Sequence, residues 1–241
     1  MEVPPVVDMC LGNSDGHVFD GLFRRNENRP VLVRCSYGLV SVNHRGLYSI
    51  RHVYKTEGGK MTPLEMFDTC RQGGYKKTWL GADWKIVGDI MYFQQSRGKL
   101  DWTFNILSAF RIPGRLGGTW FLFPFGSWCM WKTLKKVIKK NPVKAYIGYS
   151  QGGWFASYAS AVTTRPAFTF GCPKLGKGQA YLFGNVTHRK NPGDVVTIVP
   201  PWAEIYGRVM LLNKEIERPD GLSEVEWLSH HAPEEYIARL S

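Results

Sequence analysis

A serine between two glycines is the first feature of this sequence with chemical meaning. Residues 143–149 form an apolar run, and Ser150 follows it between Gly148 and Gly152 in the pattern G-x-S-x-G. A helix of small residues is expected to begin at once after the serine. A strand that turns directly into a helix through this pattern is typical of a nucleophile elbow. The sequence therefore predicts Ser150 as a nucleophile; a glycine-rich turn with a surface serine is the alternative.

The partners of such a serine must be a base and an acid. A serine hydroxyl is a weak nucleophile unless a histidine accepts its proton and a carboxylate orients that histidine. In proteins with a nucleophile elbow, the three residues follow one another along the chain in the order serine, acid, histidine. Asp194 fits as the acid, and His230 and His231 are the only histidines after it. The other downstream acids, Glu235 among them, lie in polar surroundings typical of a surface, and His188 is expected to be structural.

The elements around these residues predict an α/β fold. From residue 87 onward apolar strands alternate with helical segments, which favours a mostly parallel central sheet with helices on both faces. The expected strands are 89–94, 119–124, 143–149, 167–170 and one that begins at 185, and the expected helices are 62–71, 100–110, 127–140 and 151–162.

The first 60 residues have a different pattern. Short alternating runs within 31–54 are separated by Gly and Asn, as in hairpins or a meander. The total of 241 residues fits a single α/β domain. We therefore expect residues 1–60 to be a small β-rich segment packed on the same domain as residues 61–241, which would form the catalytic domain.

The composition limits the classes of protein and partner. Hydrophobic residues make up 44% and charged residues 21%, which excludes a disordered, fibrous or coiled-coil chain. The net charge of +11 favours an acidic partner such as an anionic membrane, although solubility alone also explains it. No nucleic acid is expected, since no zinc-finger or RNP-type motif occurs. The densest basic run has the spacing of one solvated helix face. It consists of Lys132, Lys135, Lys136, Lys139 and Lys140.

Cysteines and chain ends add little chemistry. The five cysteines are odd in number and widely spaced, so they indicate neither a disulfide framework nor a metal site. No metal and no cofactor are expected. The N-terminus lacks the pattern of a signal peptide, and no run of 18 apolar residues occurs. The expected location is cytoplasmic by default, with release or virion association left open; the oligomeric state is undetermined.

Four segments together resemble the class 3 lipase family, the fungal-type triacylglycerol lipases and their bacterial and viral relatives. Residues 148–153, GYSQGG, are similar to the family's G-H-S-L-G-G, and residues 169–176 to its T-F-G-x-P-R-V-G. Residues 194–201 resemble D-x-V-x-x-L-P-P, and His231 with Tyr236 resembles the C-terminal histidine followed by an aromatic residue. The likeness covers about residues 87–240. It implies an α/β-hydrolase-like fold and a triad of Ser150, Asp194 and His231, with His230 as the reserve base.

The same resemblance implies an oxyanion hole and a lid. Residues 93–96, FQQS, stand where the family has F-R-G-[ST], so the resemblance assigns a backbone amide to Ser96 and a second one to Gln151. Two amides aimed at the oxyanion are what acyl transfer requires. Two glutamines replace the family's Arg-Gly before Ser96. Apolar residues of segment 100–110, such as Trp102 and Phe104, stand where family lids lie; a helix packed on the core is the alternative.

The expected function is a serine carboxylic-ester hydrolase that forms an acyl-enzyme on lipid esters such as acylglycerols or phospholipids. A cutinase-like or short-chain esterase is one alternative, because cutinases share G-Y-S-Q-G and a G-D-x-V like that at residues 193–196. A non-enzymatic virion or structural binding protein on the same fold is another, and it would be expected to lack a triad member. The choice between hydrolysis and acyl transfer stays open.

Overall fold

A computed structural model describes residues 6–8, 31–35, 38–42, 48–50, 55–56, 59–94, 103, 105–213 and 229–241. The chain divides into two compact units, Met1–Met61 and Thr62–Ser241.

The smaller unit contains short strands. They are β1 (Val6–Asp8), β2 (Val31–Cys35), β3 (Gly38–Val42), β4 (Tyr48–Ile50), β5 (Lys55–Thr56) and β6 (Gly59–Lys60). The strands β2, β3 and β4 pair antiparallel in sequence order, β1 pairs parallel with β2, and β5 pairs with β6. The packing of residues 1–60 on residues 61–241 stays a prediction.

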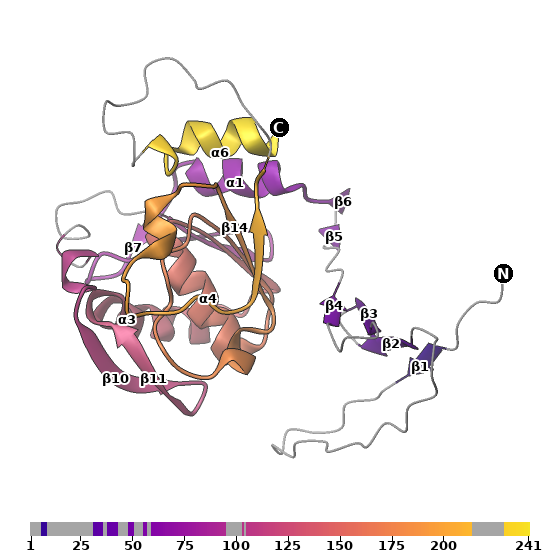
Figure 1. Cartoon of the computed structure of the whole chain (residues 1–241), viewed down its shortest axis with the longest axis horizontal. Helices are drawn as coiled ribbons and strands as arrows, with labels where there is room; N and C mark the ends of the chain where they lie inside the picture. The colour runs from indigo at the N-terminus through magenta and orange to yellow at the C-terminus, as the bar shows by residue number, and fades with distance from the viewer. Residues whose placement is uncertain are drawn as a thin grey trace. The chain divides into compact units, whose positions relative to one another are not determined.

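The larger unit is built on a mixed sheet of seven strands (Figure 1), in the order β15-β14-β13-β12-β9-β8-β7. The strands are β7 (Lys76–Lys77), β8 (Asp83–Val87), β9 (Ile90–Phe93), β12 (Ala145–Tyr149), β13 (Ala167–Phe170), β14 (Val186–Lys190) and β15 (Arg208–Leu211). Strands β9, β12, β13, β14 and β15 are parallel to their neighbours in this series, and at the other edge β8 runs antiparallel to both β9 and β7. The predicted α/β class with a mostly parallel central sheet is confirmed.

Helices cover both faces of this sheet, as the sequence predicts. Helices α3 (Phe125–Lys140) and α4 (Gln151–Thr163) lie on one face, where Phe155 of α4 meets Phe93 of β9 with ring centroids 6.2 Å apart. Helices α1 (Pro63–Arg71) and α6 (Pro233–Leu240) lie on the other. There Phe67 of α1 packs against Tyr149 of β12, at a centroid distance of 5.0 Å.

Successive side chains of a strand point to opposite faces, and this alternation decides which residues meet which helix. In β12, Tyr146 and Gly148 face α4, whereas Tyr149 faces α1 and α6. At the carboxyl end of β12, the side chain of Tyr149 therefore packs against α6, and Gly148 lies against α4.

The sequence signal at the start of α1 corresponds to a real cap. Thr62 accepts a hydrogen bond from the Glu65 amide through its hydroxyl, and Glu65 accepts one from the Thr62 amide, which forms a capping box. The helix ends at Arg71, and Gly74 has φ of 86°. The predicted helix over 62–71 is thus confirmed.

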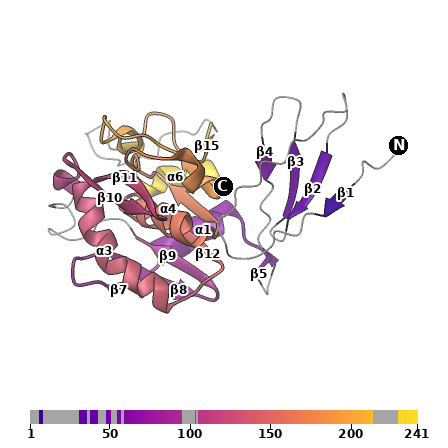
Figure 2. The same ribbon diagram turned by 90° about the horizontal axis from the view of Figure 1, so that it is seen from below.

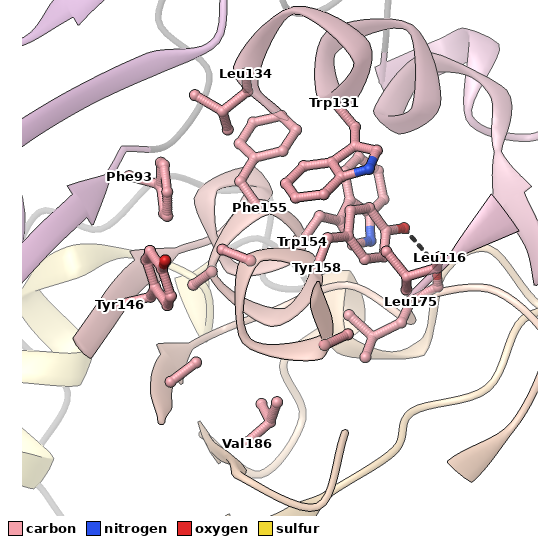
Figure 3. Packing of buried hydrophobic residues seen from close by; sticks show 14 of the residues in the cluster. Phe93, Leu116, Trp131, Leu134, Tyr146, Trp154, Phe155, Tyr158, Leu175 and Val186 are labelled. Atoms are coloured by element: carbon pink, nitrogen blue, oxygen red, sulfur yellow. Dashed lines mark hydrogen bonds between the residues drawn. The ribbon is translucent and has the colours of Figure 1, made fainter. Parts of the chain in front are cut away.

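The core lies mainly between the sheet and α3 (Figure 3). Every residue of α4 from Gln151 to Ala161 is buried, because this helix is enclosed by the sheet and by α3. Its small residues allow that close approach. Tyr158 in its middle donates a hydrogen bond to the Leu175 carbonyl, so its hydroxyl is satisfied inside the core.

A β-hairpin and short 3₁₀ turns complete the unit. These elements are β10 (Arg111–Leu116), β11 (Thr119–Pro124), η1 (Ala180–Phe183) and η2 (Val195–Ile198). The sequence predicts β11 and the central strands but not β7, β8, β10, β15 or α6.

Candidate active site

The turn from β12 into α4 exposes Ser150 in a strained conformation. Ser150 has φ of 55° and ψ of −126°, in the left-handed half of backbone space that residues with a side chain seldom adopt. A Cβ on Gly148 would lie 2.2 Å from the Gly152 carbonyl oxygen, and one on Gly152 would lie 2.3 Å from the Phe93 oxygen. Both positions therefore require glycine, since the colliding atoms are backbone.

Three of the predicted residues meet at this turn. His231 Nε2 lies 2.9 Å from Ser150 Oγ, and His231 Nδ1 lies 3.0 Å from Asp194 Oδ1 and 2.9 Å from Oδ2. The Asp194 side chain is fully buried and that of His231 is 13% exposed, whereas Ser150 is half-buried.

The surrounding bonds determine where the protons lie. Asp194 Oδ1 accepts the Val196 amide at 3.0 Å, and Oδ2 accepts the Tyr236 hydroxyl at 2.7 Å. A carboxylate that accepts from both neighbours acts as an acceptor toward His231 as well, so Nδ1 carries the hydrogen. His231 Nε2 is then the acceptor for the Ser150 hydroxyl, which is the arrangement that general-base activation of a serine needs.

Tyr236 of α6 holds the Asp194 carboxylate in place through a hydrogen bond. Its hydroxyl accepts the Asn191 amide at 3.3 Å and therefore donates to Asp194. Burial and the Asp194 carboxylate raise the pKa of Tyr236 well above its usual value, so the phenol stays protonated. The sequence marks this tyrosine only as an aromatic residue after the histidine, and its contact with Asp194 is decided by the packing of α6.

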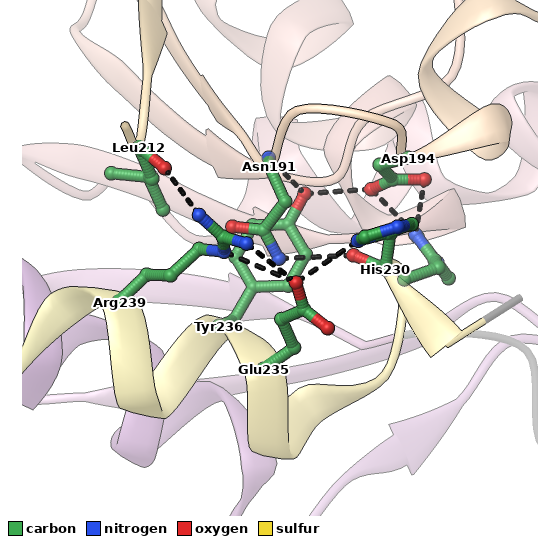
Figure 4. A network of polar contacts seen from close by, with 8 residues as sticks. Asn191, Asp194, Leu212, His230, Glu235, Tyr236 and Arg239 are labelled. Carbon is green, nitrogen blue, oxygen red and sulfur yellow. Dashed lines mark hydrogen bonds and ion pairs between the residues drawn. The ribbon is translucent and has the colours of Figure 1, made fainter. Parts of the chain in front are cut away.

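A second polar network lies beside these residues (Figure 4). His230 Nδ1 lies 3.0 Å from Glu235 Oε1, and Arg239 donates to the same oxygen from Nε at 3.1 Å and from a terminal nitrogen at 2.8 Å. Asn191 Nδ2 donates to the His230 carbonyl at 2.9 Å. His230 thus faces Glu235 rather than Ser150. The expectation that Glu235 is a surface residue is wrong: it is only 2% exposed, and its carboxylate is held by the ion pair with Arg239 and the hydrogen bond with His230.

Two glycines with positive φ leave room for the side chains of His230 and His231. A Cβ on Gly171 (φ 54°) would lie 2.8 Å from His231 Cε1, and one on Gly193 (φ 80°) would lie 2.9 Å from His230 Cδ2. Gly171 directly follows β13. A glycine at a strand end is the signal that could have identified this close approach.

The two residues assigned to the oxyanion hole differ in what can be described. Gln151 is the first residue of α4, and its main-chain N–H has no acceptor among the described residues. Its side chain donates to Asn105 Oδ1 at 2.9 Å and is buried against Met130. Ser96 lies outside the described residues. The positive end of α4 and the Gln151 amide are suited to an anion at Ser150 Oγ.

The segment expected to be a lid is described in part. Thr103 and residues 105–107 are helical, whereas Trp102 and Phe104 lie outside the described residues. Ile106 is 71% and Phe110 66% exposed, so neither is packed in the core. Trp202 donates its indole hydrogen to the Ala109 carbonyl at 2.8 Å, which joins this segment to the loop that follows Asp194.

His188 is a structural residue, as expected from its place on a strand. It is buried in β14, where Nε2 donates to the Tyr206 carbonyl at 2.7 Å and Nδ1 lies 2.6 Å from the Thr169 hydroxyl. Burial lowers its pKa from the usual 6.5 to about 4, so the ring is neutral.

In the described part of the chain, no helix combines the length and the hydropathy that crossing a bilayer demands.

Comparisons with known proteins give a limited likeness. No family model and no curated protein matches the sequence. Among solved structures, the chain is similar to Lip2 lipase from Yarrowia lipolytica, with a TM-score of 0.41 and 14% identity over 58% of this chain. It is also similar to the Rhizomucor miehei lipase in complex with its propeptide, with a TM-score of 0.34 and 18% identity over 53% of this chain. The chain covers 62% of the first structure and 52% of the second.

Proposed function

We propose that this protein is a serine ester hydrolase in which Ser150 attacks, His231 acts as general base and Asp194 orients the histidine. The observation that carries the proposal is the unbroken relay from Ser150 Oγ through both ring nitrogens of His231 to Asp194, with every heavy-atom distance at 2.9 to 3.0 Å. Such a relay at a strained turn before a helix has one well-known use, acyl transfer through a serine.

The proposed reaction proceeds in two halves. His231 Nε2 accepts the hydroxyl proton as Ser150 Oγ forms a bond to the ester carbonyl carbon, and the carbonyl oxygen becomes an oxyanion. Collapse of that intermediate breaks the bond to the alcohol, which leaves with the proton from His231. Water then repeats the sequence on the acyl-enzyme and releases the acid, which restores Ser150.

The chain's own groups would stabilise each stage. The Asp194 carboxylate stabilises the imidazolium that forms when His231 takes the proton. The Gln151 amide at the N-terminus of α4 supplies one donor for the oxyanion, and Ser96 is proposed as the second. Lipid esters are the proposed substrates, since the exposed side chains of Ile106 and Phe110 lie in the segment that Trp202 ties to the Asp194 loop.

A fluorophosphonate probe tests the proposal. The intact protein is expected to be labelled on Ser150, with loss of labelling in Ser150→Ala and strong loss in His231→Ala. Ser157, a buried serine of the same helix, supplies the matched control, because Ser157→Ala should keep full labelling. Labelling that survives in Ser150→Ala would reject the assignment. Absence of labelling in the intact, folded protein would favour the non-enzymatic binding protein.

A further inference from the structure

The positive charge of the chain is concentrated in a stretch without acids. No Asp or Glu occurs between Asp101 and Asp194, whereas basic residues recur from Arg111 to Lys190. This part of the sequence includes α3, the hairpin β10–β11 and the core strands. Because core strands bury their side chains, the unbalanced charge has to appear on α3 and the loops.

Helix α3 carries the densest part of that charge on its outer face. Lys132, Lys135, Lys136, Lys139 and Lys140 are all exposed, and none has an ion-pair partner among the described residues. At 100° per residue they share one face, opposite the buried side chains of Leu134 and Ile138. The helix therefore presents a positive stripe, as its spacing predicts.

Tryptophans flank this stripe. The Lys132 ammonium lies 3.6 Å from the ring centroid of Trp128, and the Arg115 guanidinium lies 5.3 Å from that of Trp120 on the adjacent hairpin. Trp120 is 66% exposed. Indole rings and cations thus continue from α3 onto the hairpin β10–β11. Figure 2 shows the ribbons of α3, β10 and β11 next to one another.

A further indole lies near α3, in the turn between β7 and β8. The Thr133 hydroxyl of α3 donates to Thr78 Oγ1 at 3.0 Å, and the next residue, Trp79, is 81% exposed. An indole, which has one apolar and one polar end, is suited to the boundary between water and an apolar partner.

We propose that these residues form a docking surface for a membrane that contains anionic phospholipid. The surface consists of the five α3 lysines with Trp79 and Trp120, and we call it the α3 surface. The negative surface potential of such a membrane attracts lysine side chains, and tryptophan is favoured at the level of the headgroups. This inference goes beyond the proposed function, because it involves neither Ser150 nor its partners, although docking would bring a hydrolase to lipid esters.

The contacts favour a membrane over a single-stranded nucleic acid. Bases bind by stacking on free aromatic faces. Cations occupy one face of Trp120 and of Trp128, and Trp128 also packs closely against the hairpin at Gly114. Binding to a layer of charged headgroups requires only the cations and the edges of the indole rings.

Vesicle sedimentation with the full-length chain tests the proposal. The Ser150→Ala background keeps any hydrolysis from altering the lipid, so failure of the hydrolase proposal would not change the result. Vesicles of phosphatidylcholine with phosphatidylserine are compared with phosphatidylcholine alone. Each lysine near an anionic surface contributes about fivefold in affinity, so Lys136→Gln/Lys139→Gln should weaken binding to the mixed vesicles at least tenfold. Trp79→Ala and Trp120→Ala should each weaken it severalfold.

The matched control is Arg165→Gln/Arg208→Gln, which removes the same net charge from exposed positions outside the α3 surface. It should retain near-normal binding. Equal losses in the two pairs, or no binding of the parent protein to mixed vesicles, would overturn the proposal. The proposal would also be overturned if the protein bound a labelled single-stranded RNA more tightly than the mixed vesicles, and if Lys136→Gln/Lys139→Gln abolished that binding while Arg165→Gln/Arg208→Gln did not. Melting curves for each variant establish that all are folded.

Discussion

The ring of Tyr149 is stacked on the imidazole of His231, with centroids 5.3 Å apart and planes inclined by 21°. Its hydroxyl also donates to the main-chain carbonyl of His231. One side chain, adjacent to Ser150 in sequence, therefore holds both the ring and the backbone of the proposed base. Burial raises the pKa of Tyr149 well above its usual value, so the hydroxyl remains a donor throughout the working range.

Tyr149→Phe is expected to lower kcat about five- to tenfold, because it keeps the stacking but leaves the His231 carbonyl without its donor, a loss of about 1 kcal/mol. The measurement is hydrolysis of p-nitrophenyl butyrate, with the melting temperature as a check on folding. Tyr92→Phe, another buried tyrosine, should have no comparable effect on kcat. An unchanged kcat in Tyr149→Phe would mean that the stacking alone positions His231.

His231→Ala and His230→Ala form an adjacent pair with opposite expectations. Only His231 approaches Ser150, so its loss should reduce kcat roughly 10³-fold or more. His230→Ala removes one partner of Glu235 and should cost at most about tenfold. If His230→Ala is inactive while His231→Ala retains activity, the reserve base is the true one.

Arg239→Ala should destabilise the fold by about 3–5 kcal/mol, because it removes the ion-pair partner of the buried Glu235 carboxylate and leaves only the hydrogen bond with His230 among the side-chain contacts described above. Urea unfolding measures this free energy. Arg71→Ala is the matched control: it breaks the exposed pair with Glu234 on the same helix and should cost less than about 1 kcal/mol. Similar values for the two variants would show that burial of Glu235 adds nothing to the pair.

The free energy of unfolding should fall as the pH falls from about 6.5 toward 4, in part through His188. Burial lowers the folded pKa to about 4, whereas the unfolded chain binds the proton near 6.5. Above 6.5 both states are neutral and the stability is fully present; below it the unfolded state gains protons first. The loss is about 3 kcal/mol at most. In His188→Asn the pH dependence over this window should become shallower, and an unchanged slope would assign it to other groups.

Ile106→Ser and Phe110→Ser should lower activity on emulsified long-chain esters more than on soluble short-chain esters, if segment 105–110 contacts lipid. Both side chains are exposed, so the melting temperature should hardly change. Tyr181→Ser, at a 70% exposed position in η1, is the control and should affect neither activity. Equal losses of activity on both kinds of ester would contradict a role of this segment as a lid. The same comparison separates a lipase from the cutinase-like or short-chain esterase.

The sequence by itself was sufficient for features that depend on neighbouring residues. The alternation of apolar strands and helices predicts the parallel sheet, the Thr62 capping box predicts the start of α1, and the lysine spacing predicts the outer face of α3. These are local rules of periodicity and capping, so they can be applied without knowing the tertiary contacts.

Only the tertiary structure decided which distant groups meet. The sequence left His230 and His231 as neighbours with equal local environments, and the resemblance alone favoured the second. The fold separates them, because α6 directs His231 toward Ser150 and His230 toward Glu235. Likewise Glu235 is charged and therefore expected at the surface, yet Arg239 one turn later makes its burial possible. The meeting of His231 with Ser150 and Asp194 depends on how the C-terminal segment packs against the sheet, which no local pattern encodes.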